Sequence, residues 1–178
     1  MFTESQLSQI RAHFPSLSRQ QSGSAVVYFD GPAGSQVPKR VADRISSAII
    51  HHSANRSGKF ATSREVDQLM ADAHAAGADF FGAADPKEIV FGANMTTMTL
   101  HFSRSLSQLW QPGDAIVVTR LDHDANVTPW VLAARDRQVT VRYAEVNLTD
   151  CTLDDQHFAA QLNSKTKLVA FTCASNSI

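Results

Sequence analysis

Three segments of the sequence place polar residues directly after a strand pattern, where ligands are often bound. The first is Asn94-Met95-Thr96-Thr97, which follows an apolar stretch and opens a helical pattern. Free backbone N–H groups at a helix N-terminus attract phosphate, and threonine hydroxyls add donors. The same residues could simply cap the helix, because asparagine is a favoured N-cap. The segment contains no G-x-G-x-x-G pattern, so a dinucleotide fingerprint is absent.

The second segment centres on His123, which lies between Asp122 and Asp124 after the apolar stretch Ala115–Thr119. A histidine in this position could bind a metal, act as a general base or stack on a cofactor ring. The alternative is a loop histidine with solvated acidic neighbours. A metal would need further ligands, and the other histidines considered lack convincing spacing: His51, His52 and His101. We therefore predict no metal site.

The third segment, 172–177, follows another apolar stretch and contains Asn176, whose amide offers both a donor and an acceptor. An ordinary turn after a strand is the alternative. The sequence stops at Ile178, and a compact domain seldom ends where a buried strand emerges on the ligand side. We expect Cys173 to be a buried small hydrophobic residue rather than a catalytic thiol.

The elements that would position these segments alternate between strand and helix patterns. Strands are predicted at Ala115–Thr119 and Lys167–Thr172, and the nearly continuous apolar runs within them, Ala115–Val118 and Leu168–Phe171, predict burial on both faces. Further strands are predicted at Ala25–Phe29, Glu88–Phe91 and Val139–Ala144. Capping-box patterns at Thr3/Gln6 and Thr62/Glu65 open two helices, and further helical patterns lie at Pro38–Ile49, Thr97–Leu109, Pro129–Arg137 and Leu153–Leu162. This alternation predicts an α/β fold with a mostly parallel sheet, whose ligands sit at the carboxyl ends of its strands.

The composition of the 178 residues is that of a globular protein. It is 43% hydrophobic and 19% charged, with a formal net charge of −1. We therefore expect neither a nucleic-acid partner nor a membrane partner. There is no apolar run of transmembrane length and no secretory leader pattern at the N-terminus. Cys151 and Cys173 do not form a disulfide framework, so a cytoplasmic, reducing compartment is expected.

Taken in order, these segments resemble the class V aminotransferase-like enzymes that use pyridoxal 5′-phosphate (PLP), and above all their cysteine desulfurase-like branch. The most specific match is Asp122-His123-Asp124-Ala125-Asn126-Val127 with Pro129-Trp130. The other matching stretches are Tyr28–Gln36, Glu88–Phe91, Pro112–Asp114 and Lys165–Asn176. The resemblance implies the N-terminal part of a fold-type I PLP-dependent transferase large domain, truncated, over residues 25–178, preceded by a helical segment over residues 1–24.

The resemblance also implies roles for individual residues in binding PLP. Asn94, Met95 and Thr96 stand where the family has its phosphate loop. Met95 has no hydroxyl, so backbone N–H groups and Thr96 would hold the phosphate. His123 would stack on the pyridine ring. Asn176 would hydrogen-bond near the 3′-oxygen or the substrate carboxylate.

The family's Schiff-base lysine and the aspartate that pairs with the pyridinium nitrogen both follow the Asn176 position. We therefore expect this chain to lack catalytic residues and to be inactive alone. The parent reaction would convert L-cysteine, a small amino-acid substrate, to alanine and persulfide sulfur in a homodimer. Aminotransferases and epimerases are relatives that the sequence does not separate from desulfurases. Two other hypotheses are a non-catalytic α/β module that binds a phosphorylated ligand or a partner chain, and a metal-dependent hydrolase centred on Asp122-His123-Asp124.

Overall fold

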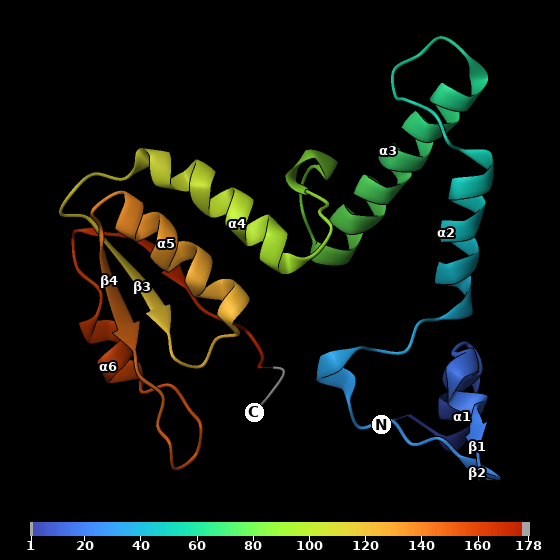
Figure 1. Cartoon of the computed structure of the whole chain (residues 1–178), viewed down its shortest axis with the longest axis horizontal. Coiled ribbons are helices and arrows are strands. Elements are labelled where there is room, and N and C mark those ends of the chain that lie inside the picture. Colours follow the sequence, from blue (N-terminus) through green and yellow to red (C-terminus); the bar gives the residue numbers. More distant parts are fainter. Residues whose placement is uncertain (1, 176–178) are drawn as a thin grey trace. The chain divides into compact units, whose positions relative to one another are not determined.

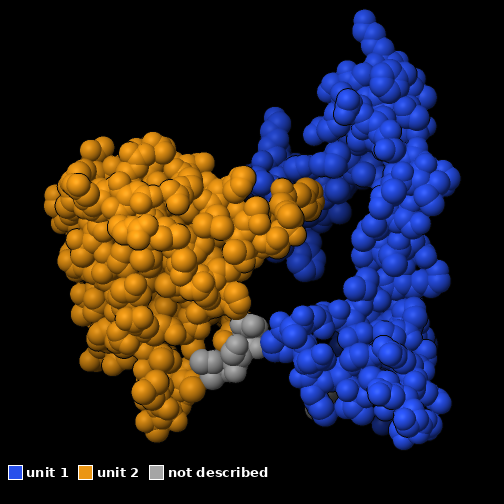
Figure 2. Space-filling view, in the orientation of Figure 1, with its two compact units in different colours: residues 1–90 blue, residues 91–178 orange. Residues whose placement is uncertain are grey.

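The computed structural model describes residues 2–175. The chain divides into two compact units, Met1–Val90 and Phe91–Ile178, which Figure 2 shows in different colours. The predicted segments that carry polar residues after a strand all begin in the second unit.

The second unit is built on a three-stranded parallel sheet in the order β4-β3-β5. Its strands are β3 (Ala115–Thr119), β4 (Thr140–Ala144) and β5 (Thr166–Ala170), and its helices are α4 (Met95–Leu106), α5 (Thr128–Asp136) and α6 (Asp155–Ala160). Figure 1 shows α4 and α5 running side by side next to this sheet. The predicted α/β architecture, a parallel sheet flanked by helices, is confirmed.

The core of this unit forms around β3, the middle strand. All five residues of β3 are buried, and Ile116 and Val118 pack in one cluster with Trp130 of α5. The Trp130 ring meets Phe102 of α4 edge to face, with the ring centroids 6.0 Å apart. The prediction of burial on both faces is right for β3 but wrong for the end of the other apolar run. The side chain of Phe171 is 55% exposed, because β5 ends at Ala170 and has only β3 as its neighbour among the described strands.

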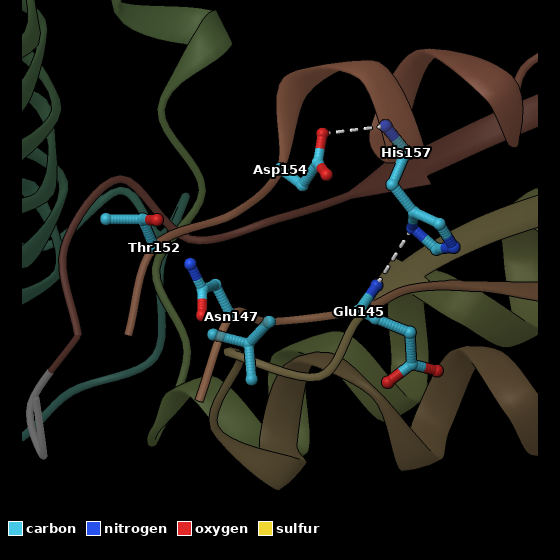
Figure 3. A pocket seen from close by; sticks show the side chains of 6 residues that line it. Glu145, Asn147, Thr152, Asp154 and His157 are labelled. Atoms are coloured by element: carbon cyan, nitrogen blue, oxygen red, sulfur yellow. Dashed lines mark hydrogen bonds between the residues drawn. The ribbon is translucent and has the colours of Figure 1, made fainter. Parts of the chain in front are cut away.

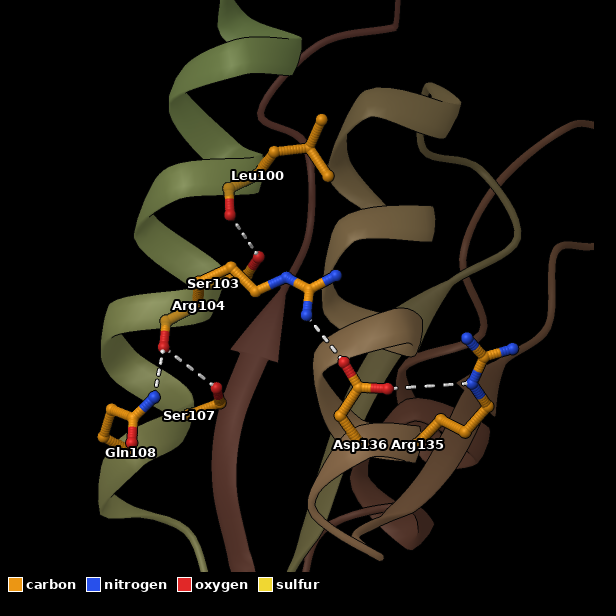
Figure 4. A network of polar contacts seen from close by, with 7 residues as sticks. All are labelled: Leu100, Ser103, Arg104, Ser107, Gln108, Arg135 and Asp136. Atoms are coloured by element: carbon orange, nitrogen blue, oxygen red, sulfur yellow. Dashed lines mark hydrogen bonds and ion pairs between the residues drawn. The ribbon is translucent and has the colours of Figure 1, made fainter.

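Helices α4 and α5 pack against each other, and two buried serines lie in α4 and just after its end. Ser103 and Ser107 are buried, and their hydroxyls donate to backbone oxygens one turn back, at Leu100 (3.0 Å) and Arg104 (3.2 Å). Figure 4 shows these bonds and the ion pair between Arg104 Nη1 and Asp136 Oδ2, 2.6 Å apart. Both partners of the pair are about half exposed, so it contributes at most about 1 kcal/mol. Apolar packing, such as that of Phe102 and Leu106 with the cluster around Trp130, therefore matters more than this ion pair for the contact.

A tight turn starts β3 at the amino edge of the sheet. Gly113 has φ +91°, which is in the region that favours glycine. The buried carboxylate of Asp114 accepts the N–H of Gln111 at 2.9 Å and lies 3.7 Å from the Lys167 ammonium. The turn before this strand thus also ties β3 to the neighbouring strand β5.

The first unit is mainly helical. It contains α1 (Glu4–Ala12), α2 (Lys39–His51), α3 (Ala61–Phe81) and a short hairpin of β1 (Gln20–Gln21) and β2 (Ser24–Ala25). The capping box predicted at Thr3 is confirmed, because its side chain and that of Gln6 each bond the other's backbone N–H. The one predicted at Thr62 is wrong. Helix α3 already begins at Ala61, and its N-cap residue, Phe60, has no side-chain capping bond.

Two predicted strands are not formed as predicted: Ala25–Phe29 in the first unit, and Glu88–Phe91 at the end of that unit. Strand β2 stops at Ala25, and the side chains of Val27 and Phe29 beyond it are 68% and 94% exposed. Glu88 closes a 3-10 turn, Pro86–Glu88, and the residues after it are not in a strand. An apolar run becomes a strand only when a neighbouring strand satisfies its backbone groups. The described part of the chain offers these two runs no such neighbour.

Candidate functional site

The three predicted polar segments meet around one cavity of about 610 Å³ in the second unit. It lies where β3 and β5 end and α4 begins, the edge at which open parallel sheets bind their ligands. The lining residues are Asn94, Met95, Thr96, Asp122, His123, Ala125, Asn126 and 171–175. The structure therefore brings together four of the five predicted cofactor-binding residues. The fifth, Asn176, lies outside the described residues.

At the first of these segments, the start of α4, Asn94 acts as a helix cap. Its Oδ1 accepts the backbone N–H of Thr97 at 2.9 Å, so the amide side chain is occupied. The N–H groups of Met95 and Thr96 belong to the first turn, where no intrahelical carbonyl can reach them. Together with the Thr96 hydroxyl, they make this corner of the cavity suited to an anion.

The ring of His123 is held by its own loop. Its Nδ1 accepts the backbone N–H of Ala125 at 3.0 Å. An accepting Nδ1 places the proton of the neutral ring on Nε2. The residue is exposed and borders the cavity, so its ring is accessible to a ligand.

The segment after β5 forms a local turn in which the Thr172 hydroxyl donates to the Ala174 carbonyl at 2.7 Å. The prediction that Cys173 is buried is wrong, because β5 ends at Ala170 and the cysteine lies exposed in the loop beyond it. Cys173 also borders a neighbouring cavity of about 310 Å³ that Cys151 lines from the loop before α6. The 21 residues between these cysteines hid that proximity in the sequence.

Asn126 lines the cavity although no functional role was predicted for it, and Asp122, which was predicted only as part of the hydrolase hypothesis, lines it too. The Asn126 Nδ2 donates to Asp122 Oδ1 at 2.7 Å. The i, i+4 spacing of an acid and an amide is the signal that could have indicated this contact. Periodicity alone does not show that a non-helical loop brings the two side chains together.

A second, more polar cavity of about 370 Å³ lies beside the end of β4 (Figure 3). Two of its side chains are already bonded to backbone groups. Asp154 Oδ1 accepts the His157 N–H at 3.0 Å, and His157 Nδ1 accepts the Glu145 N–H at 3.3 Å. Among residues 2–175, no group of three or more His, Cys, Asp and Glu side chains is arranged to hold a metal ion. Within the same range, no helix is both long enough and apolar enough to cross a bilayer.

Comparison with known proteins agrees with this geometry. Residues 27–178 match the family model of Aminotransferase class-V. The chain is 32% identical to a cysteine desulfurase of Dickeya dadantii (strain 3937) and 33% identical to one of Yersinia pestis (strain Pestoides F). Each alignment covers 96% of this chain and 42% of the relative, so the chain spans less than half the length of these relatives.

Solved structures give the same result for the fold. The apo cysteine desulfurase of Thermococcus onnurineus NA1 superposes with a TM-score of 0.81 at 26% identity, over 95% of this chain and 40% of that one. The cysteine desulfurase CsdA of Escherichia coli superposes with a TM-score of 0.74 at 23% identity, over 95% and 41% of the two chains, and shows the shared fold. A structure of C-DES with glycine covalently linked to its PLP cofactor superposes with a TM-score of 0.70 at 25% identity, over 89% and 39%.

Proposed function

The chain belongs to the aminotransferase class-V family, and on that premise we propose that it forms part of the cofactor site of a PLP-dependent cysteine desulfurase. The observation that carries the proposal is the cavity at the carboxyl ends of β3 and β5. It combines the start of a twelve-residue helix with an exposed histidine ring.

The residues around the cavity fit the chemical groups of PLP. The N–H groups of Met95 and Thr96 and the Thr96 hydroxyl would hold the phosphate, aided by the positive end of the α4 dipole. The ring of His123 would stack on the pyridine, because its Nδ1 is already bonded to Ala125 and its face is exposed. Asn176 would supply a polar edge. Bound PLP would provide an electron sink for reactions at the α-carbon of an amino acid.

The proposed reaction of the whole enzyme is the conversion of L-cysteine to alanine and persulfide sulfur. Residues 1–178 contribute binding groups to it rather than a covalent attachment point. Five lysines occur in the sequence, at positions 39, 59, 87, 165 and 167. None of them lines this cavity in the described part of the chain. PLP held by these residues alone would therefore be bound non-covalently and without turnover.

The chain acts as a homodimer in the cytoplasm under this proposal. Helix α2 supports the homodimer, because it presents exposed apolar side chains on one side of the helix. Val41, Ile45 and Ile49 are 42%, 56% and 69% exposed. Such surface is costly to leave in water, and a second copy of the chain would cover it.

The test of cofactor binding is a PLP titration of the chain, followed by absorbance and by quenching of tryptophan fluorescence. We expect saturable binding that inorganic phosphate competes away. His123→Ala should weaken it roughly five-fold, the scale of one lost aromatic contact of about 1 kcal/mol. His101→Ala is the matched control, because His101 is an exposed histidine of α4 that does not line the cavity.

Borohydride treatment distinguishes PLP that is bound covalently to a lysine from PLP that is bound non-covalently. Recovery of unmodified chain after reduction is expected, since the proposal places no lysine at the cofactor. Stoichiometric labelling of a single lysine would contradict the non-covalent form. Absence of saturable binding, or equal effects of both histidine substitutions, would overturn the site. Tight binding without turnover would leave the non-catalytic module as the better description of residues 1–178 alone.

A further inference from the structure

The loop that carries His123 is held by a chain of side-chain hydrogen bonds with both ends in the core. At one end, the buried indole N–H of Trp130 donates to Asn126 Oδ1 at 3.2 Å. The Asn126 Nδ2 then donates to Asp122 Oδ1 at 2.7 Å. At the other end, the hydroxyl of Thr119, which is 1% exposed, donates to Asp122 Oδ2.

The chemistry of these groups fixes the direction of every bond. An indole N–H can only donate, so the Asn126 atom that faces it must be the oxygen. The amide nitrogen must then face Asp122, whose ionised carboxylate can only accept. The Thr119 hydroxyl donates to that carboxylate and accepts the backbone N–H groups of Leu121 and Asp122, each at 3.2 Å. No bond in this chain can be reversed.

Asp122 is the central group of this network, because one of its oxygens binds Thr119 directly and the other is linked to Trp130 through Asn126. Trp130 and Thr119 are buried in α5 and at the end of β3, whereas His123 is exposed at the cavity. The backbone from Asp122 to Asn126 is therefore fixed at both ends. Between those ends, the N–H of Ala125 is aimed at His123 Nδ1.

We propose that Asp122 is a positioning residue, which acts through Asn126 and the loop backbone to hold the His123 ring in one tautomer and one orientation toward the ligand. Asp122 need not itself touch the ligand for this role. The part of the inference that concerns the ligand rests on the proposed PLP site. The part that concerns the His123 ring stands on the hydrogen bonds alone.

The neighbouring acid offers a matched control. The Asp124 carboxylate accepts the Thr128 hydroxyl at 2.6 Å, takes no part in the network and does not line the cavity. Asp122→Asn and Asp124→Asn each remove one negative charge at nearly constant volume. Only the first replaces an acceptor with a donor that would face Asn126 or Thr119.

The test measures the tautomer of the His123 ring and the affinity for PLP separately. The ¹⁵N shifts of His123, recorded without ligand at a pH where the ring is neutral, should show the Nε2–H tautomer in the parent chain and in Asp124→Asn. Asp122→Asn should show a mixture of tautomers. PLP affinity should fall roughly ten-fold in Asp122→Asn, the scale of one hydrogen bond to a charged group. Asp122→Glu, which keeps two acceptor oxygens, should restore part of both signals.

A second pair of variants tests the same network at Thr119, in case Asp122→Asn fails to fold. Thr119→Val removes the hydroxyl and should reproduce the loss of the single tautomer, whereas Thr119→Ser keeps the hydroxyl and should not. Unchanged ring shifts in both Asp122→Asn and Thr119→Val would overturn the proposal. So would equal effects of Asp122→Asn and Asp124→Asn. Failure of the parent chain to bind PLP, with the tautomer changes still observed, would count against the PLP site and leave the positioning role in place.

Discussion

The side chain of Asn94 shows how one residue can resolve two interpretations of a motif. An asparagine before Met95 and Thr96 could bind a phosphate or cap a helix, and the structure uses its Oδ1 for the Thr97 N–H. The cap benefits a ligand indirectly. It orders the first turn of α4, whose remaining N–H groups can then face an anion.

Substitutions at Asn94 should separate stability from phosphate binding. Asn94→Ala should lower the free energy of unfolding by about 1 kcal/mol, because the cap is lost. Asn94→Ser should retain both the cap and PLP affinity. Asn94→Asp should retain the cap but weaken PLP binding at least roughly ten-fold, since it places a negative charge beside the phosphate. Urea unfolding and PLP titration of the three variants measure the two effects. PLP affinity that follows stability across the series would refute a phosphate site here.

Among the elements, the parallel sheet matters most because its strands end together at the cavity. The register pairs Thr119 with Ala144 at the end of β3 and β4. On the other side, Val118 pairs with Ala170 of β5. The loops that follow β3 and β5 therefore leave the sheet at nearly the same level. That shared level is why residues near 122 and 172 line one cavity.

Glycine should be the favoured residue in the turns at the ends of two elements, because both turns have a positive φ. Gly113→Ala should cost about 1–2 kcal/mol of stability, because φ +91° disfavours a side chain even though nothing crowds the position. Gln138, just after α5, has φ +57°. Gln138→Gly should stabilise by about 0.5–1 kcal/mol, the relief of backbone strain less the added chain entropy.

Urea unfolding of the two variants, with the Phe91–Ile178 unit monitored through Trp110 and Trp130, measures both changes. A neutral Gly113→Ala, or a destabilising Gln138→Gly, would show that these turns adopt other backbone angles in solution.

On the scale of the whole molecule, the burial of side chains is uneven. The core cluster of buried residues lies within 110–170, in the second unit. In the described part of the first unit, Ser63 and Ala78 are the buried residues, and several large apolar side chains of α2 are exposed. The first unit thus has more apolar surface to cover than it has core.

Self-association of the chain should depend on the exposed side of α2. Light scattering after size exclusion should give the mass of a dimer at micromolar concentration. The double substitution Ile45→Lys/Ile49→Lys should shift it to a monomer, because two charges would be buried in the contact. Leu148→Lys is the control, since Leu148 is 88% exposed in a loop of the second unit. A parent chain that is monomeric at all concentrations would contradict the homodimer.

The amino-acid sequence by itself determined the elements that carry strong local signals. The capping box at Thr3 and the apolar run of β3 depend on neighbouring residues only, and each is found where it was predicted. The alternation of strands and helices likewise implied the parallel sheet. Because parallel strands end at one edge, that topology implied that the segments after β3 and β5, around His123 and Thr172, would meet.

Only the tertiary structure decided features that depend on partners far along the chain. The apolar run Ala25–Phe29 could not form its predicted strand because no neighbouring strand pairs with it in the described residues. Cys173 is exposed because β5 ends before it. The network through Asp122 joins a strand end to a buried tryptophan across a non-helical loop. Hydrogen bonds of this kind depend on how the side chains pack. The sequence therefore shows which polar side chains are present but not which of them form hydrogen bonds with each other.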